Sequence, residues 1–184
     1  MNLDPVLVHR IFGALVLAFA LATWLRETGA WRARWADYLP PAALLLLGGL
    51  LFGDPWLFHG GDFGTEGHQH MQQGLLVVAA GVAEWFRVRR AAPHWLLALV
   101  MPAMLSGLGV GFLWHEQHAG ADVLIQTVQH RIMGATLLVA ALVKLLANLG
   151  YRDGQGSRGG WALVLVVFAC ELLLYAEPGS HAGH

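Results

Sequence analysis

Long runs of uncharged apolar residues dominate this chain and restrict what it can fold into. Residues 95–114 pass through about twenty positions without an acidic or basic side chain, which is the length of helix that crosses the hydrocarbon core of a bilayer. Of the 184 residues, 57% are hydrophobic and only 12% are charged. This composition is too apolar for a soluble domain of that size, so we expect an all-α integral membrane protein.

Six segments of this kind are predicted to span the membrane. They are residues 6–25, 39–58, 71–86, 95–114, 132–149 and 161–176. The third and sixth are short, and each carries a glutamate, Glu84 and Glu171 respectively. The first begins with Asp4 and Pro5, an N-cap acid followed by proline at the first helical position, and it lacks the basic start and cleavage site of a signal peptide.

The basic residues predict the orientation of these spans. Nine of the eleven lysines and arginines fall between spans one and two, between three and four, or around the turn between five and six. The positive-inside rule makes that side cytoplasmic. Both termini then face the periplasm, and we expect the protein in the bacterial inner membrane.

Histidines and acids gather on the opposite, outer side. Of the ten histidines, only His94 falls on the basic side, and seven of the twelve acids accompany the other nine. The predicted outer face is therefore rich in imidazole and carboxylate groups, both of which bind metal ions.

An internal repeat places some of these histidines in equivalent positions. A histidine followed four residues later by glycine occurs three times, at His9 and Gly13, at His70 and Gly74, and at His130 and Gly134. The intervals of 61 and 60 residues predict three helical hairpins, approximately residues 1–61, 62–121 and 122–184, within one transmembrane domain. The hairpins would point the same way, each even helix ending outside with an acid, which argues against inverted-repeat transporters.

The glycines suggest that the three histidines converge. Small residues let membrane helices approach closely, so we expect these glycines to face the inside of the helix bundle. The histidine one helical turn before each glycine would then point toward the bundle axis as well. Other outer residues lie three or four positions apart, the spacing of one helix face. The predicted metal ligands are His9, Glu66, His70, His115, Glu116, His118 and His130.

Imidazole with carboxylate suits copper(II), zinc or iron, and nearby methionines would tolerate copper(I). We expect copper first, then zinc or iron. Cys170 stands alone within a span and forms no intrachain disulfide or thiolate cluster. Glu84 aligns with Lys144 near the cytoplasmic side, where an ion pair is the simplest interpretation, whereas Glu171 lies nearer the outer side and is a candidate for an ion or proton path.

The leading hypothesis is therefore metal capture, transport or resistance, with a periplasmic metal donor or acceptor protein as partner. One alternative is a membrane redox protein or metalloenzyme that uses the same histidines to hold a haem or a two-metal centre. Another is an assembly factor or subunit without a cofactor. No substrate cleft can be inferred, which argues against an enzyme and leaves that question and the oligomeric state open. Nucleic-acid binding has no support, because the basic residues form no patch.

Overall fold

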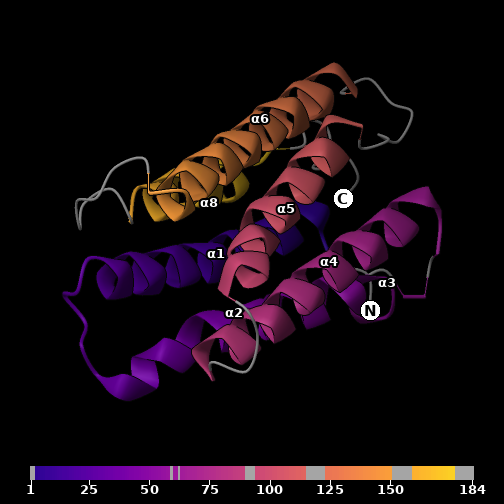
Figure 1. The fold of residues 1–184 in the computed structure, drawn as a ribbon. Helices are drawn as coiled ribbons and strands as arrows, with labels where there is room; N and C mark the ends of the chain where they lie inside the picture. The colour runs from indigo at the N-terminus through magenta and orange to yellow at the C-terminus, as the bar shows by residue number, and fades with distance from the viewer. Residues whose placement is uncertain are drawn as a thin grey trace.

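The computed structural model describes residues 3–58, 60–61, 63–89, 94–114, 123–150 and 159–176, apart from the side chains of Thr65, Glu66 and His94. All regular structure in these ranges is helical (Figure 1). The α-helices are α1 (Pro5–Glu27), α2 (Leu39–Phe52), α3 (Asp54–Leu57), α4 (Thr65–Val88), α5 (His94–Leu113), α6 (Val123–Asn148) and α8 (Gly160–Leu173), and a 3₁₀ helix, η1 (Arg34–Tyr38), precedes α2.

The start of α1 follows the prediction. The Asp4 carboxylate accepts a hydrogen bond of 2.8 Å from the backbone N–H of Val6, and Pro5 occupies the first turn. At α4 the N-cap residue is Gly64, and Thr65 is the first residue of the helix. Helix α6 begins nine residues before the predicted apolar span, so His130 lies well inside a continuous helix.

The second predicted span is broken, contrary to the expectation of one continuous helix over residues 39–58. Helix α2 ends at Phe52, and the short helix α3 starts at Asp54 after Gly53. Pro55 explains the break, since proline has no backbone N–H to donate to the preceding turn and its ring crowds the carbonyl four residues earlier. The break leaves Asp54 in the first turn of α3, fully buried.

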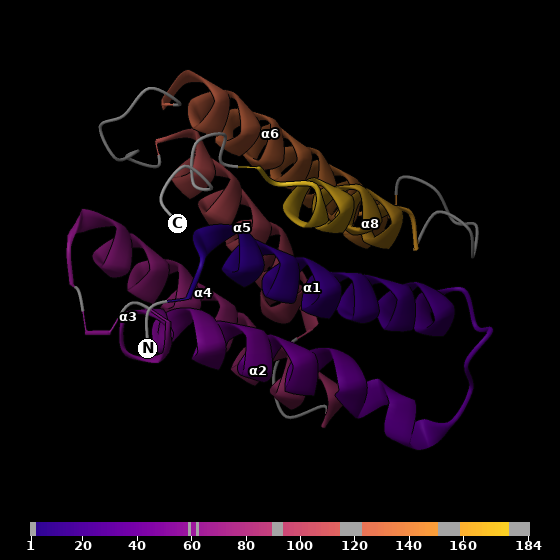
Figure 2. The same cartoon turned by 180° about the vertical axis from the view of Figure 1, so that it is seen from behind.

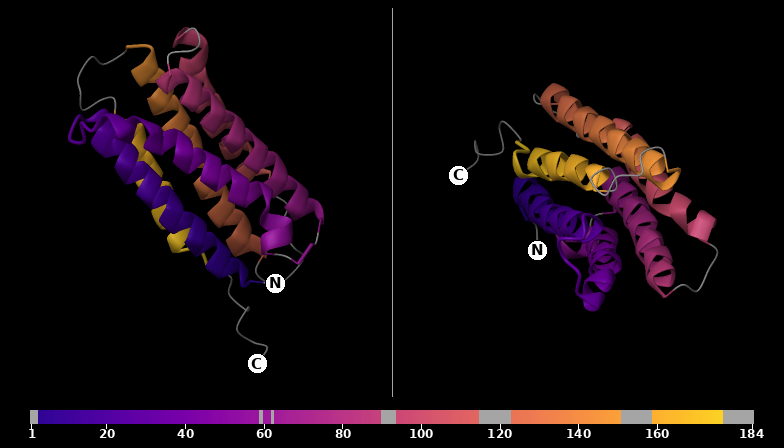
Figure 3. Two further views of the ribbon diagram at one scale, coloured as in Figure 1. Left: turned by 90° about the horizontal axis from the view of Figure 1, so that it is seen from below. Right: turned by 60° about the vertical axis from the view of Figure 1, so that its left-hand side comes forward.

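The long helices and α8 form a closed ring. Each packs against two neighbours, in the order α1, α2, α4, α5, α6, α8 and back to α1. Figures 1 and 2 show α1 beside α8 from both sides, and Figure 3 shows the helices running lengthwise past one another. The most extensive contacts are between α2 and α4, α5 and α6, and α1 and α8, so they join successive predicted hairpins rather than the two helices of one hairpin.

Glycines lie at all three of these extensive crossings. A Cβ atom on Gly13 would stand 2.9 Å from Leu173 Cγ in α8, and one on Gly134 would stand 2.7 Å from the Gly109 carbonyl oxygen in α5. A Cβ atom on Gly74 would collide with the Phe52 backbone in α2. The helices can therefore approach this closely only because these positions lack a side chain, which is the role expected of small residues between membrane helices.

Among the described residues, four helical segments are long and apolar enough to cross a membrane, as expected for a membrane protein. They are Pro5–Glu27, Arg34–Phe52, Trp95–Leu113 and Val123–Asn148. Helix α8 is apolar but has only 14 residues, or about 21 Å of rise, against the ~30 Å of a bilayer core. Helix α4 has the length, 24 residues, but a more polar sequence.

The outward surface of these helices is apolar along its length. Leu46 in α2, Leu142 in α6 and Val167 in α8 each expose half or more of their surface. Large contiguous apolar patches are rare on soluble proteins, so this surface fits contact with lipid. We call the end of the ring that holds His9 and His130 the histidine end. The opposite end, which holds Arg26, Arg87 and Lys144, is the basic end.

Candidate functional site at the histidine end

Three histidines from three helices line one cavity on the axis of the ring. His9 comes from α1, His70 from α4 and His130 from α6, and the cavity has a volume of about 130 Å³. His130 is buried, whereas His9 and His70 are partly buried. The helices that carry these three histidines, α1, α4 and α6, alternate with α2, α5 and α8 around the ring, so the three side chains reach the axis from three directions.

Aromatic side chains hold two of the imidazole rings. The His9 ring stacks on Tyr175 at a centroid separation of 3.7 Å, and the His130 ring stacks on Phe112 at 5.6 Å. Tyr175 also meets the edge of His130, and the centroids of His9 and His130 lie 5.9 Å apart. Such packing restricts side-chain rotation, so both rings are fixed relative to the cavity.

Each of the three histidines engages an oxygen acceptor through Nδ1. The Nδ1 atom of His9 lies 2.8 Å from the Pro5 carbonyl oxygen, that of His130 lies 2.9 Å from the Gln126 carbonyl oxygen, and that of His70 lies 2.7 Å from Asp54 Oδ2. Carbonyl and carboxylate oxygens only accept, so Nδ1 carries the proton. An imidazole that donates through Nδ1 has Nε2 left as the nitrogen that can bind a metal, which is the arrangement typical of metal-binding histidines.

The bond to a carbonyl is not by itself a mark of function. His68 makes the same Nδ1 contact with the carbonyl oxygen of Gly64, at 3.1 Å, yet its side chain is exposed. What distinguishes His9 and His130 is that they line the cavity. His68 therefore serves as a matched reference for experiments on the other histidines.

Asp54 is a buried carboxylate beside this site that the predicted ligand set omits. Its carboxylate is buried against His70 because the chain breaks at Gly53, and a continuous helix over residues 39–58 would place it differently. A signal was present in the sequence. Asp54 falls within a residue of the same repeat phase as Glu116 and Glu177, and all three lie at or just beyond the outer end of an even-numbered span.

The remaining predicted residues are placed less completely. His115, Glu116 and His118 lie outside the described residues, and of Glu66 only the backbone in α4 is described. Glu171 lies in α8, where its carboxylate accepts a hydrogen bond of 2.7 Å from Thr136 Oγ1 in α6. Glu171 does not line the histidine cavity.

Below the histidines the cavity walls are almost entirely apolar. They are formed by side chains such as Leu47, Val77, Met104, Leu105 and Phe168. Apolar cavities of this size remain dry, and an unpaired ion in such surroundings is strongly disfavoured. The polar groups of the site are thus confined to its histidine end.

Within the described ranges, no group of three or more histidine, cysteine, aspartate or glutamate side chains is close enough together to hold a metal ion. The three imidazoles line one cavity without forming such a group. Comparisons of the chain with protein-family models, with curated proteins and with solved structures gave no match.

Proposed function

We propose that this protein binds a transition metal at the histidine end, with copper favoured over zinc or iron, and that it does so as a six-helix protein of the bacterial inner membrane. In this proposal α1, α2, α4, α5, α6 and α8 are the six spans. The basic end faces the cytoplasm, because basic residues concentrate on that side of membrane proteins. The histidine end and both termini then face the periplasm.

The repeat supplies the architecture of the proposed site. Each of the hairpins 1–61, 62–121 and 122–184 contributes one histidine on its first helix and one glycine at a crossing one turn below. The closed order of the ring supports this assignment, because it brings the first helices of the three hairpins to alternate positions around the axis.

One observation carries the metal proposal: three imidazoles from three helices line one cavity, each with Nδ1 on an oxygen acceptor. Metal-ligating histidines almost always use their second nitrogen in this way, which orients the ligating nitrogen. Met104 lines the same cavity, and a thioether beside imidazole favours copper over harder cations. Glu66, His115, Glu116 and His118 are the proposed ligands that complete the coordination.

Metal capture fits this arrangement better than passage through the ring. Apart from the Met104 thioether and the Gln73 amide, the walls below the histidines are apolar, and removing a cation from water without a full set of replacement ligands costs far more than thermal energy. A captured ion would leave by the side from which it came, to a periplasmic acceptor protein.

The first test measures metal content and the optical spectrum of the tag-free protein purified in detergent without added metal. Near-stoichiometric copper, zinc or iron without a Soret band is the expected result. Variants His130→Asn and His70→Asn should lose most of that metal, whereas His68→Asn should keep it. A Soret band, or equal losses in all three variants, would contradict the proposal.

A further inference from the structure

The basic end of the ring contains a second, larger cavity, with a volume of about 640 Å³. It is bounded by the end of α1, the connection to η1, η1 itself, and the ends of α4 and α6. Its walls are polar, in contrast to the cavity below the histidines. The basic residues that line it are Arg26, Arg32, Arg34, Arg87 and Lys144.

Acidic residues compensate only part of this positive charge. Asp37 accepts a hydrogen bond of 2.7 Å from Arg26 Nε, and Glu84 lies 2.6 Å from Arg87 Nη2. Glu27 accepts from Lys144 Nζ at 2.8 Å. Three carboxylates thus face five cationic side chains, and the cavity keeps an excess of positive charge.

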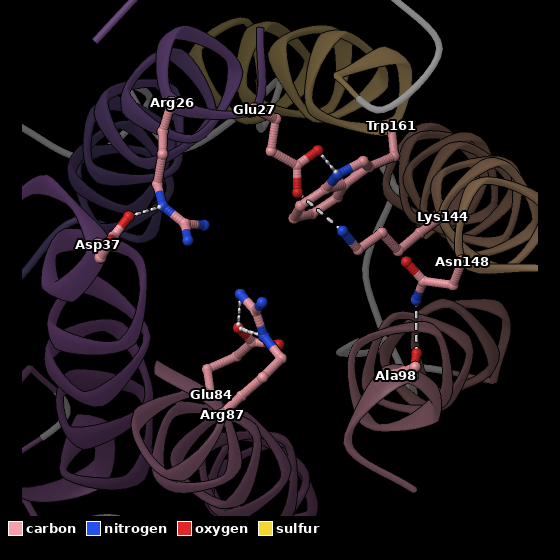
Figure 4. A network of polar contacts seen from close by, with 9 residues as sticks. All are labelled: Arg26, Glu27, Asp37, Glu84, Arg87, Ala98, Lys144, Asn148 and Trp161. Carbon is pink, nitrogen blue, oxygen red and sulfur yellow. Dashed lines mark hydrogen bonds and ion pairs between the residues drawn. The ribbon is translucent and has the colours of Figure 1, made fainter. Parts of the chain in front are cut away.

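Arg32 and Arg34 account for that excess. Arg32 donates through Nε to the Gly29 carbonyl oxygen at 3.1 Å, and neither arginine is in an ion pair within the described part of the chain. Arg26 binds Asp37 through Nε alone, and Figure 4 shows the rest of its guanidinium directed at the opening between the helices, opposite that of Arg87. Several N–H donors therefore face the same space.

We propose that this cavity binds a phosphate-bearing anion. Guanidinium groups present paired N–H donors that match the oxygens of a phosphate group, and here they approach from α1, from the connection to η1 and from α4. The inference uses neither the histidines nor any metal, so it stands or falls independently of the proposed function.

The ligand chemistry has two sources, the headgroup of an anionic phospholipid and a soluble phosphate. Aromatic side chains mark the rim as a membrane interface: Trp31 lines the cavity, and Trp35 and Tyr38 are exposed beside it. Tryptophan and tyrosine concentrate at headgroup level, and basic pockets between helices on the cytoplasmic side bind lipid phosphates.

The test is calorimetric titration of the full chain, purified in an uncharged detergent, with three probes. These are inorganic phosphate, a short-chain phosphatidylglycerol, and a phosphatidylcholine with the same acyl chains. Arg32→Gln and Arg34→Gln should each weaken binding of the anionic probe about fivefold, and the double variant roughly twenty- to thirtyfold. Both side chains are exposed, and circular dichroism checks that the helices are retained.

Arg89→Gln is the matched control, because Arg89 lies over the Trp85 ring at the same end of α4 but does not line the cavity. Binding of phosphatidylglycerol alone, lost in the double variant, supports a lipid headgroup. Binding of inorganic phosphate as well, lost in the same variant, supports a soluble phosphate ligand. No binding of either anion, equal binding of phosphatidylcholine, or an equal loss in Arg89→Gln overturns the proposal.

Discussion

The two ends of the ring are built from the same helices but are held together differently. Around the histidine end, glycines at the crossings bring helix backbones into contact, and the cavity there is small, about 130 Å³. At the basic end, long side chains join different helices through the ion pairs Arg26–Asp37 and Lys144–Glu27, around a cavity of about 640 Å³. Close backbone packing fixes side chains in place, whereas charged bridges leave room for a solvated ligand.

The largest effect is expected from a substitution that forces two closely packed helices apart. Gly48→Ala would put a Cβ atom 2.7 Å from the Val78 backbone nitrogen, whereas the adjacent Gly49 has no atom within 4 Å of the same position. Overpacking of this kind costs about 1–3 kcal/mol. We expect Gly48→Ala to lower the free energy of unfolding in detergent by that amount. A similar loss in Gly49→Ala would show that the crossing is not the cause.

A change at Asp54 should come next in size. Asp54→Asn keeps the volume of the side chain but removes the charge that faces His70, and loss of a carboxylate behind a metal-binding histidine lowers metal affinity about 10–100-fold. Competition titration with a chelator measures the metal affinity of the variant and of the unchanged protein. Asp37→Asn, which removes a carboxylate at the basic end, should leave metal affinity unchanged.

Ionic strength should affect ligand binding at the two ends of the ring to different extents. Raising the ionic strength from about 0.01 M to 1 M shortens the Debye length from about 30 Å to 3 Å. Binding of an anionic probe to the open basic cavity should weaken roughly tenfold over this range. Metal affinity at the partly buried histidines should change much less, and parallel losses in the two titrations would remove the distinction between the ends.

The smallest expected effect concerns the aromatic side chains. Tyr175→Leu removes the ring that stacks on His9, and such pairs contribute about 0.5–1.5 kcal/mol. Metal affinity should therefore fall about two- to tenfold. Tyr38→Leu is the control, because Tyr38 packs against Trp85 at the other end, and an equal loss there would point to general destabilisation.

Local patterns in the sequence predicted much of this structure. Apolar length located the helices, and Asp4 with Pro5 marked the start of α1 correctly. The glycines that follow His9, His70 and His130 gave the reason to expect these histidines near one axis, because a glycine identifies the side of a helix that meets its neighbour.

Features that depend on ring order were not predictable in the same way. We expected Glu84 to pair with Lys144, and this is wrong: Glu84 binds Arg87 one turn away, and Lys144 binds Glu27, 117 residues distant. The distant pair forms because α1 and α6 both adjoin α8, where Trp161 Nε1 donates to the same Glu27 carboxylate at 2.7 Å. Asp54 was missed for a local reason, since the break at Pro55 was not foreseen.

The contact between α1 and α8 also has a consequence for biosynthesis. These are the first and last helices of the ring, and Tyr175, which stacks on His9, follows the end of α8. While the chain is being made, the face of α1 that carries His9 and Gly13 therefore lacks its α8 partner until α8 itself has been inserted. The histidine cavity is thus complete only when α8 is in place, and a chain that ends before α8 would carry all three histidines on a ring left open to lipid.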